Sequence, residues 1–536
     1  MFKKLGKISS IYTNKYGNLG LKGFIAIAST VGLLLFISLS CTSLPSLEGR
    51  VESSALSIAE AEQTRLGSAI APLSSQHQQL SGIRLLESPE DAFAARVLLA
   101  QNAQKTLDLQ YYIWHEGITS AMLFEAITDA ANRGVRVRML LDDNGIAGLD
   151  EALSALDRLE NVQVRLFNPF VQRRFKKLGF ITDFSRVNRR MHNKSFTVDN
   201  TVTVIGGRNI GDEYFGATSG ILKQDLDLVA VGSVVNEVSV DFDKYWASAS
   251  AYPIEGIVGS TKTSTYTTAE YMPAQLNNPE RDVYIRALKS SSLVTAIIAQ
   301  EPLFEWKPTR MVSDDPSKGI GKVDKEGLLM VKLGEVMGAP ESTVLLVTPY
   351  FVPTQQGVDI FTALAKTGVS IDVLTNSMQA TDVLSVHAGY AKHRKELLEG
   401  GVQLFELRPS TVDEESNIMK LGPFGSSASS LHAKTFAVDS QRLFVGSFNF
   451  DPRSMNLNTE LGFVLESSTL AEKVEDEFSQ RVRPTAYQLI LDEDNKILWV
   501  ESNGDKQTIH STEPGMTLFS RAALAVFSAL PIEWLL

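Results

Sequence analysis

Cysteine and clustered metal ligands are what this chain of 536 residues lacks most clearly. It contains a single cysteine, Cys41, and seven histidines. One cysteine excludes an intramolecular disulfide and a thiolate metal cluster, and the histidines are too scattered for a zinc-binding spacing. We therefore expect no metal and no other cofactor. Because 44% of the residues are hydrophobic and 21% are charged, a disordered chain is also excluded, and the length leaves room for several domains.

Basic residues are outnumbered as well. The chain has 51 Lys and Arg against 62 Asp and Glu, which gives a net charge of −11. The charged residues of segment 1–41 are all lysines, so the remainder is more acidic than the whole chain. Sequence-independent binding to nucleic acid depends on many Lys and Arg that neutralise phosphates. We therefore expect no nucleic acid as a partner, and any site for an anionic group must be local.

The N-terminal segment has the features of a targeting signal. Its lysines precede an uncharged stretch, 23–47, whose apolar centre at 31–39 is as long as the hydrophobic region of a signal peptide. We expect residues 1–41 to be either a lipoprotein signal, with Cys41 as the acylated lipid anchor, or an uncleaved membrane helix. Both leave the body on the extracytoplasmic side of a membrane, inner or outer. A buried core helix fits the lysine-rich flank least, and residues 42–82 are predicted to be a linker.

The body of the chain repeats one order of elements. Two runs typical of β-strands, separated by a helical stretch, occur in the first part of the body and again in the second. The predicted strand, helix and strand cover 107–114, 119–134 and 135–141 in the first copy, and 344–350, 354–368 and 369–374 in the second. This alternation predicts an α/β fold in which helices cover sheets. We expect two such halves, 83–270 and 271–515, and an apolar segment, 516–536, that packs on the core or lies at a membrane interface.

Two copies of the pattern H-x-K-x-x-x-x-D are the strongest chemical signal, and each is followed by a glycine and an asparagine at the same offsets. The members are His192, Lys194, Asp199, Gly206 and Asn209 in the first copy, and His432, Lys434, Asp439, Gly446 and Asn449 in the second. In a strand, residues two apart share a face, so each histidine points with its lysine at one spot. A lone H-x-K is a weak signal, but its repetition in two divergent halves favours one shared site over coincidence.

This set of residue types suits chemistry at phosphorus. Lysines and asparagines supply positive charge and hydrogen-bond donors for phosphoryl oxygens, on which negative charge accumulates in the transition state. Of two histidines, one attacks phosphorus to form a phosphohistidine while the other acts as acid and then as base, and no metal is needed.

Carboxylates are expected to hold the two imidazoles in the correct tautomer. We assign this role to Glu460 and to Asp227, which we take as its counterpart. Asp199 and Asp439 are expected to fix strand ends rather than to take part in catalysis. Ser447 is expected to bind the substrate phosphate, and because its counterpart is Gly207, the site has this hydroxyl on one side only.

The two motifs resemble the paired signature of the phospholipase D superfamily over most of the chain after about residue 82. Segments similar to bacterial cardiolipin synthases are 110–115, 197–199, 206–215, 241–246, 386–394 and 530–535. The resemblance implies two phospholipase D-like α-β-α halves packed about a pseudo-two-fold axis with one shared active site. It also implies His192 and His432 as the nucleophile and acid/base pair, with His192 favoured for attack. Lys194, Lys434, Asn209 and Asn449 are implied as the phosphate-binding set.

The implied activity is the joining of two phospholipids into cardiolipin at a membrane. Phosphatidylglycerol is the acceptor in such enzymes, and phosphatidylethanolamine is the phosphatidyl donor in one type of them. Two alternatives stay open, namely hydrolysis of the phosphohistidine by water, as in a phospholipase D, and a catalytically silent lipid-binding scaffold. The oligomeric state is not predicted.

A basic cluster runs into the first motif. Segment 173–194 holds eight Lys and Arg and a single acid, Asp183, in a chain that is otherwise acidic. Such a patch attracts anionic phospholipid head groups. A solvated basic loop is the alternative, but the cluster adjoins the first motif, so we expect contact with a phospholipid substrate or with the membrane surface.

Overall fold

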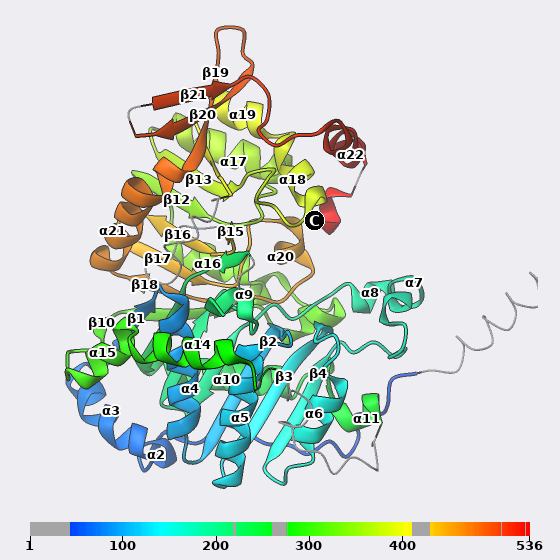
Figure 1. The fold of residues 1–536 in the computed structure, drawn as a ribbon, viewed down its shortest axis with the longest axis vertical. Helices are drawn as coiled ribbons and strands as arrows, with labels where there is room; N and C mark the ends of the chain where they lie inside the picture. The colour runs from blue at the N-terminus through cyan, green and yellow to red at the C-terminus, as the bar shows by residue number, and fades with distance from the viewer. Residues whose placement is uncertain are drawn as a thin grey trace, which may run out of the picture.

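The computed structural model describes residues 43–217, 221–259, 275, 277–409, 429–504, 506–530 and 532–536. Cys41 and the predicted signal or anchor segment lie outside the described residues. Figure 1 shows two halves stacked along the long axis, the N-terminal half below and the C-terminal half above. The predicted α/β class is confirmed, since each half is built on a mixed sheet. None of the helices in the part of the chain that the structure describes is long and apolar enough to cross a membrane.

The first half is built on a nine-stranded sheet. In spatial order the strands are β10 (Glu305–Lys307), β1 (Ser81–Leu86), β8 (Asp227–Gly232), β6 (Val202–Gly206), β5 (Ser195–Val198), β2 (Thr106–Ile113), β3 (Arg136–Gly145), β4 (Val162–Phe167) and β9 (Ala251–Pro253). The three strands β2, β3 and β4 run parallel, and the other pairings are antiparallel. Helices α5 (Ile118–Asn132) and α6 (Asp150–Asp157) make the crossovers that parallel neighbours require.

The second half repeats this order in a ten-stranded sheet. Its strands are β11 (Thr309–Ser313), β18 (Leu461–Glu466), β17 (Arg442–Gly446), β16 (Thr435–Val438), β12 (Thr343–Val347), β13 (Ser370–Asn376), β14 (Gln403–Leu407), β19 (Ala486–Leu491), β20 (Ile497–Asn503) and β21 (Lys506–His510). The run β18-β17-β16-β12-β13-β14 matches β8-β6-β5-β2-β3-β4 in order and in strand direction. The repeat predicted from the sequence is therefore a structural repeat.

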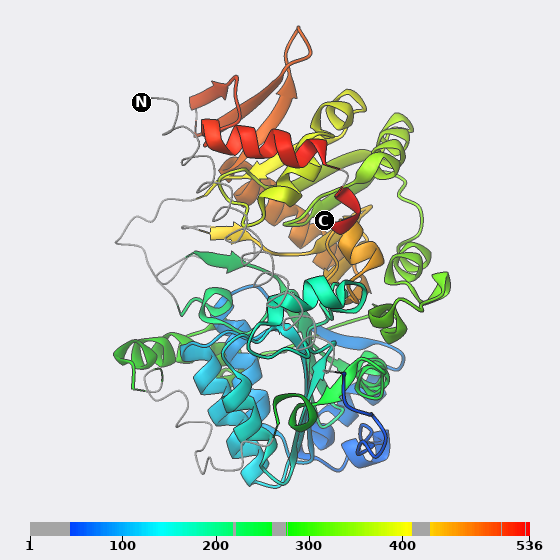
Figure 2. The same cartoon turned by 90° about the vertical axis from the view of Figure 1, so that its right-hand side faces the viewer.

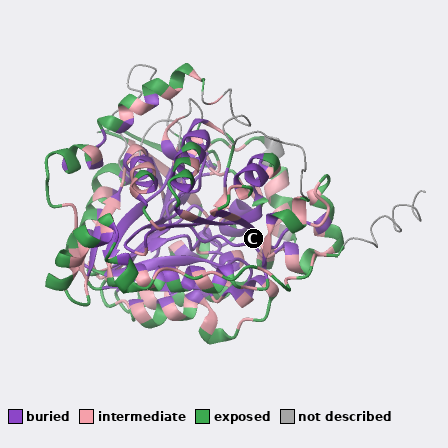
Figure 3. Ribbon diagram, turned by 90° about the horizontal axis from the view of Figure 1, so that it is seen from below, coloured by how far each residue is buried: buried purple, intermediate pink, exposed green. Residues whose placement is uncertain are grey.

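Apolar clusters cover both faces of each sheet, and one of them joins the halves. One cluster joins the inner faces of both sheets and includes Ile205 and Leu228 from the first and Val347 and Phe405 from the second. It also takes side chains from α10 (Ser233–Trp246) and α21 (Ser468–Glu477). Separate clusters lie on the outer face of each sheet. Seen from below, the buried strands run through the middle of the molecule and the exposed helical faces lie outside (Figure 3).

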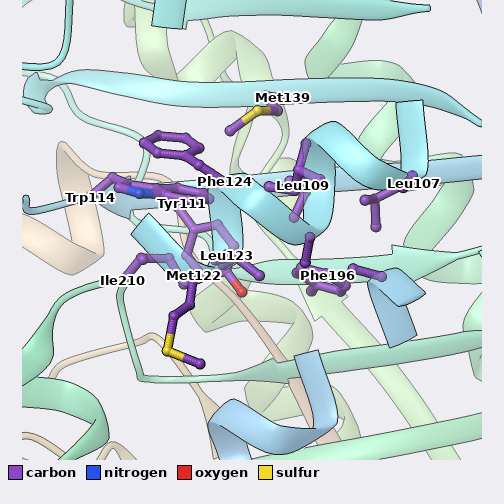
Figure 4. Packing of buried hydrophobic residues seen from close by; sticks show 14 of the residues in the cluster. Leu107, Leu109, Tyr111, Trp114, Met122, Leu123, Phe124, Met139, Phe196 and Ile210 are labelled. Atoms are coloured by element: carbon purple, nitrogen blue, oxygen red, sulfur yellow. The ribbon is translucent and has the colours of Figure 1, made fainter. Parts of the chain in front are cut away.

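The core of the first half shows why segment 107–114 reads as a strand. Alternate side chains of β2, Leu107, Leu109 and Tyr111, are fully buried. Figure 4 shows them packed with side chains of helix α5. Beyond the strand end, the Trp114 ring stacks on Phe124 with 4.9 Å between ring centroids.

Further helices cover the two sheets and connect the strands. The longer ones are α4 (Pro89–Asn102), α14 (Pro279–Lys289), α15 (Ser292–Ile298), α16 (Leu329–Met337), α17 (Thr354–Lys366), α18 (Leu384–Ala391), α19 (Arg394–Glu399) and α22 (Leu518–Ala529). The short ones are η1 (Lys176–Leu178), α7 (Gly179–Thr182), α8 (Phe184–Val187), α9 (Asp212–Phe215), α11 (Ile254–Val258), η2 (Pro316–Ile320), η3 (Lys325–Gly327), α20 (Pro452–Asn456), η4 (Phe478–Val482), η5 (Arg483–Thr485) and η6 (Glu533–Leu535).

The described part of the predicted linker packs on the first half. Two helices, α2 (Ile58–Ala61) and α3 (Arg65–Gln76), begin at the side-chain caps Ser57 and Thr64. Upstream of them, Arg138 donates to the Ser53 carbonyl at 2.9 Å and Asn200 donates to the Leu56 carbonyl at 2.9 Å. The Ser- and Ala-rich composition concealed these contacts, because side chains of the first half that are distant in sequence provide the donors.

The boundary between the halves also differs from the expected 270/271. Helices α14 and α15 pack on α4 of the first half, and the Asp91 carboxylate accepts a hydrogen bond from the Leu293 amide at 2.7 Å. Strand β10 then pairs with β1 in the first sheet, whereas β11 pairs with β18 in the second. The chain therefore changes halves at Pro308, which separates these two strands.

The C-terminal segment contacts the second half. Helix α22 lies against α18, and His393 Nε2 is 2.9 Å from Glu533 Oε1. The amide of Arg453 donates to the Leu536 carbonyl at 2.7 Å. The last residues are thereby tied to α20, the short helix that follows the second motif.

Candidate active site

The two histidine motifs meet between the halves. His192 to Lys194 lies just before β5 and His432 to Lys434 just before β16, in segments without regular secondary structure rather than within the strands as expected. The His192 amide donates to the Thr459 carbonyl at 2.8 Å, and the His432 amide donates to the Gln224 carbonyl at 2.7 Å. The second contact extends the two-stranded sheet of β7 (Leu222–Gln224) and β15 (Ser429–Leu431). Each motif is thus held in place by backbone of the other half.

Glu460 of the second half holds the His192 imidazole. Its Oε2 lies 2.8 Å from His192 Nδ1, and His192 as a whole is 7% exposed. The Ser447 hydroxyl donates to Glu460 Oε2 at 2.5 Å and the Ser454 hydroxyl to Oε1 at 2.9 Å. With the Nδ1 proton donated to this carboxylate, Nε2 of His192 keeps its lone pair. Ser447, expected to bind phosphate, instead directs its hydroxyl to Glu460.

Asp225, not Asp227, holds the His432 imidazole, and this corrects the expected pairing. Asp225 Oδ2 contacts His432 Nδ1. Asp227 forms a buried ion pair with Arg96 at 2.8 Å and accepts from the Arg208 amide at 3.1 Å.

Strand register explains why Asp227 was predicted instead of Asp225, two residues earlier. Gly206 pairs with Asp227 across β6 and β8, and Gly446 pairs with Gly462 across β17 and β18. Counting back two residues from each partner makes Asp225 the counterpart of Glu460. Residues two apart lie on the same face of a strand, so alternation alone does not distinguish Asp225 from Asp227.

The unequal length of the two carboxylates explains why Gly207 stands opposite Ser447. A Cβ on Gly207 would lie 2.1 Å from Asp225 Oδ1, so the shorter carboxylate occupies the space that a side chain would need. In the second half, the Ser447 hydroxyl and the longer Glu460 side chain share this space through their hydrogen bond.

Both lysines of the motifs are almost fully buried beside the imidazoles. Lys194 Nζ donates to the His192 carbonyl at 2.5 Å, and Lys434 Nζ lies 2.9 Å from His432 Nδ1. Burial lowers the pKa of Lys434 to about 8 and lowers the pKa of Lys194 well below its usual range. A bound anion would stabilise the charged form of both ammonium groups.

Burial also shifts the pKa values of the histidines and their carboxylates. Burial and then the lysines of the motifs hold the pKa of His192 and of His432 well below the usual range. Burial raises the pKa of Glu460 to about 7 and raises the pKa of Asp225. Titratable groups held in a buried site with opposed shifts are typical of acid–base centres.

The two asparagines are buried near the motifs with unused polar atoms. Asn209 Oδ1 accepts from the Ile113 amide at 3.1 Å, and its Nδ2 has no hydrogen-bond partner among the described residues. Asn449 is 5% exposed, and within the same ranges its Oδ1 has no partner. Buried amide groups without partners provide hydrogen-bonding capacity for a ligand.

Asp199 and Asp439 lie at turns away from the imidazoles. Asp199 accepts from the amides of Gln104, Lys105 and Thr106, and Asp439 accepts from the amides of Glu341, Ser342 and Thr343. Both residues have positive φ, 52° and 56°. Each carboxylate therefore ties the turn after its motif to the start of a central strand, and a structural role remains our interpretation.

Several polar side chains beside His432 were not predicted. Lys223 lies two residues before Asp225 on the approach to His432, and its Nζ is 2.6 Å from Asp382. The Tyr350 hydroxyl donates to the same carboxylate at 2.8 Å. The only sequence signal for them was the strand alternation that places Lys223 on the face of Asp225.

Half of the eight basic residues in the predicted cluster form ion pairs with acidic side chains of the first half. Ion pairs join Arg173 to Asp143 and Asp150, Lys176 to Asp143, Arg186 to Asp183, and Arg190 to Asp142. Arg189 donates to the carbonyls of Lys318 and Asn456. The side chains of Arg174 and Lys177 are exposed. The charge that this segment presents to solvent is therefore smaller than its composition implied.

Comparison with known proteins gives a consistent family. The model of the family described as "Cardiolipin synthase, PLD-like domain" matches residues 98–246 and 333–482, and each range contains one histidine motif. Cardiolipin synthase C of Escherichia coli (strain K12) is 47% identical over 472 residues, which cover 88% of this chain and all of that protein. Cardiolipin synthase of Listeria monocytogenes serotype 4a (strain HCC23) is 25% identical over 76% of this chain and 70% of its own length.

A solved structure shares the fold. Phosphatidylserine synthase from Haemophilus influenzae Rd KW20 superposes with a TM-score of 0.55 at 12% sequence identity. The alignment covers 87% of this chain and 99% of that one, so the likeness extends over both halves.

Proposed function

Because the chain belongs to the family of cardiolipin synthases with phospholipase D-like domains, we propose that it is a membrane-associated phosphatidyltransferase that makes cardiolipin. Its acceptor is phosphatidylglycerol, and its phosphatidyl donor is a second phospholipid, which we take to be phosphatidylethanolamine. The transfer passes through a phosphohistidine.

The crossed pairing of the histidines is the observation that carries the proposal. Each imidazole is bonded through Nδ1 to a carboxylate of the opposite half, His192 to Glu460 and His432 to Asp225. Because Nδ1 is occupied, Nε2 is the nitrogen left for chemistry on each ring. Two such rings at one interface supply a nucleophile and an acid for displacement at phosphorus.

In the first displacement, His192 Nε2 attacks the phosphorus of the donor. A P–N bond forms and the P–O bond to the head-group alcohol breaks, while His432 in its protonated form gives its Nε2 proton to the departing oxygen. The negative charge of the bound phosphate raises the pKa of the adjacent imidazole, which allows His432 to hold that proton in a buried site.

In the second displacement, neutral His432 takes the proton from a hydroxyl group of phosphatidylglycerol. The oxygen of that hydroxyl attacks phosphorus, the P–N bond breaks and His192 is restored. The product carries two phosphatidyl groups on one glycerol, which is cardiolipin.

Positive charge around the phosphoryl oxygens favours both steps. We assign Lys194, Lys434, Asn209 and Asn449 to these oxygens, because all four are buried members of the two motifs and bring two ammonium groups and two amides. Fixed donors in a buried site stabilise developing charge without reorganisation of water. Glu460 and Asp225 keep the imidazoles oriented and favour their protonated forms.

We further propose that residues 1–41 hold the body on the extracytoplasmic side of the membrane. Either Cys41 is acylated or the segment remains as a membrane helix. Metabolic labelling with radioactive palmitate separates the two, because a Cys41→Ser variant loses the label only if Cys41 is acylated. Protease added to spheroplasts will degrade the body if it lies outside the inner membrane.

The activity is tested with purified full-length protein in mixed vesicles. Phosphatidylglycerol is supplied with and without phosphatidylethanolamine, and the products are separated by mass spectrometry. Cardiolipin that requires both lipids, and that is lost in His192→Ala and His432→Ala, supports the proposal. Phosphatidic acid as the sole product would indicate a hydrolase, and absence of both products would indicate a lipid-binding scaffold.

A further inference from the structure

The segment between β4 and the first motif exposes apolar side chains to solvent. Phe175, Leu178, Ile181 and Phe184 are 60%, 37%, 81% and 41% exposed. They recur every third residue along η1, α7 and α8, and the exposed cations Arg174 and Lys177 precede the first two of them. Solvent-facing apolar side chains gathered in this way mark a contact site for another apolar surface.

The exposed side chains stand on a firmly packed base. Phe180 packs on Phe170 with 5.5 Å between ring centroids, and Gly179 is buried against the same ring. Asn168 donates to the carbonyls of Arg186 and Arg189 at 3.3 and 2.9 Å. The outward direction of the apolar side chains is therefore built into the fold.

A hollow of about 770 Å³ lies beside these side chains. Its lining includes the four cations Arg173, Arg174, Lys176 and Lys177 and the apolar residues Phe175, Leu178 and Ile181, together with Asp150 and Glu151. Arg173 and Lys176 already neutralise Asp150 and Asp143. Two exposed cations beside an apolar wall match a phospholipid, which has an anionic phosphate next to its acyl chains.

The C-terminal segment adds apolar side chains to the same side of the molecule. Val526 of α22, Leu530 directly after this helix and Trp534 of η6 are exposed. Helices α7, α8 and α22 all lie at the right of Figure 1, and that side faces the viewer in Figure 2. Tryptophan is enriched where proteins meet the boundary between lipid and water.

We propose that Arg174, Phe175, Lys177, Leu178, Ile181 and Phe184 form a docking face that enters the surface of an anionic phospholipid bilayer. The apolar side chains insert among the acyl chains, and the two cations bind lipid phosphates. Because segment 173–190 leads directly into His192, docking holds the catalytic interface next to the bilayer that supplies its substrates. This inference rests on the proposed function for its substrates, but binding is measured independently of activity.

Lipid contact at one position is tested with tryptophan probes. Full-length Ile181→Trp is added to vesicles of phosphatidylglycerol and phosphatidylethanolamine whose acyl chains are brominated, which quench tryptophan fluorescence on contact. Ile298→Trp is the matched control, because Ile298 is 75% exposed and lies on α15 at the opposite side of Figure 1. We expect the fluorescence added at position 181 to be quenched and that added at position 298 to be unaffected. Equal quenching of both, or of neither, would overturn the proposal and, in the latter case, leave the surface for a protein partner.

The role of charge is tested in the Ile181→Trp background. We expect quenching to be stronger with phosphatidylglycerol than with phosphatidylcholine alone, and Arg174→Gln with Lys177→Gln to remove that difference. Equal quenching by both lipids in the parent would contradict the anionic preference.

An activity measurement links the docking face to catalysis. Ile181→Asp is expected to reduce cardiolipin formation from vesicles about tenfold and to leave formation from detergent-dispersed lipids unchanged, because a charged side chain is costly to insert. Ile298→Asp should alter neither rate. An equal loss in vesicles and in detergent would refute a role in docking. If the parent protein makes no cardiolipin, the proposed function fails, while the quenching result still decides whether the face binds lipid.

Discussion

Each half supplies a carboxylate that contacts the histidine of the other half, but the two carboxylates and the residues beside them differ. In the first half, the short carboxylate of Asp225 contacts the imidazole of His432, and Gly207 leaves it room. In the second half, the longer carboxylate of Glu460 contacts His192 and is held by the Ser447 hydroxyl. The comparison shows that the length of each carboxylate side chain is matched to the residue beside it, Asp225 to Gly207 and Glu460 to Ser447. A substitution at one member of a pair must therefore be interpreted together with the other member.

The two histidines have equivalent carboxylate partners, but we propose that they differ in role. Replacing either of them is expected to have the largest effect on activity of all the substitutions considered. We expect His192→Ala and His432→Ala each to lower cardiolipin formation by at least about 10⁴-fold, because nucleophile and acid act as a unit. Quenching a reaction with radiolabelled donor in SDS at alkaline pH, which preserves the acid-labile P–N bond, should trap a phosphoenzyme in His432→Ala and none in His192→Ala. The reverse pattern would assign the attack to His432.

Asp225 and Asp227 are two residues apart, and we expect substitution of the first to reduce activity and substitution of the second to reduce stability. Asp225→Asn should lower kcat/KM about 10²- to 10⁴-fold with little change in thermal stability, because the imidazole loses its orienting carboxylate. Asp227→Asn removes the charge from the buried pair with Arg96 and should cost about 3–5 kcal/mol of unfolding free energy.

Activity per folded molecule distinguishes these outcomes. The folded fraction of the Asp227→Asn protein is measured by circular dichroism, and its kcat/KM is corrected for that fraction. The corrected value should be close to that of the parent protein. A specific activity as low as that of Asp225→Asn would mean that Asp227 contributes to the reaction directly.

Gly207 and Ser447 test the space around the carboxylates. Gly207→Ala places a Cβ against Asp225 Oδ1 and should both reduce kcat about tenfold to 100-fold and cost about 1–3 kcal/mol through overpacking. Ser447→Ala removes one hydrogen bond to Glu460 and should cost about 1 kcal/mol with a smaller loss of activity. Chemical denaturation and initial rates measured on both variants give the comparison, and a more severe effect at position 447 would contradict it.

The pKa of Glu460 predicts the smallest effect. Burial raises this pKa from 4.5 to about 7, so the folded chain holds a proton that the unfolded chain releases. The stability that this proton linkage contributes is present below about pH 4.5 and is lost as the pH rises through 7. Glu460→Gln removes this titration. The free energy of unfolding of the variant relative to the parent should therefore be more favourable at pH 8 than at pH 5, by about 3 kcal/mol at most, and its Tm relative to the parent should be higher at pH 8. Calorimetry at the two pH values checks this, and an equal difference at both would show that the carboxyl is ionised throughout.

Repetition made the site predictable as a pair of motifs. His192 and His432, with their lysines and asparagines, were found because four residue types recur at equal offsets, and the structure places the two histidines at one interface between the halves. The carboxylate partners were harder to predict. Glu460 was found, but Asp225 was missed because alternation along a strand leaves two candidates, and only the hydrogen-bond register between β6 and β8 separates them.

Contacts between residues distant in the sequence also determine how much charge segment 173–194 exposes and whether the predicted linker packs on the first half. Segment 173–194 looked like a basic patch, yet Asp142, Asp143 and Asp150 neutralise three of its eight basic side chains. The predicted linker packs on the first half because Arg138 and Asn200 bind its carbonyls. Neither set of contacts has a local sequence signal, since the partners are 23 to 48 residues apart in the ion pairs and 85 and 144 residues apart in the linker contacts.

By itself, the sequence determined the order of strands and helices, the repeat and the residue types of the site, because hydrophobic periodicity and motif spacing are local properties. Only the tertiary structure decided which carboxylate holds which imidazole, and that each pair crosses between the halves. The physical reason is that strand register and the packing of two sheets bring together atoms that are more than 200 residues apart in the chain.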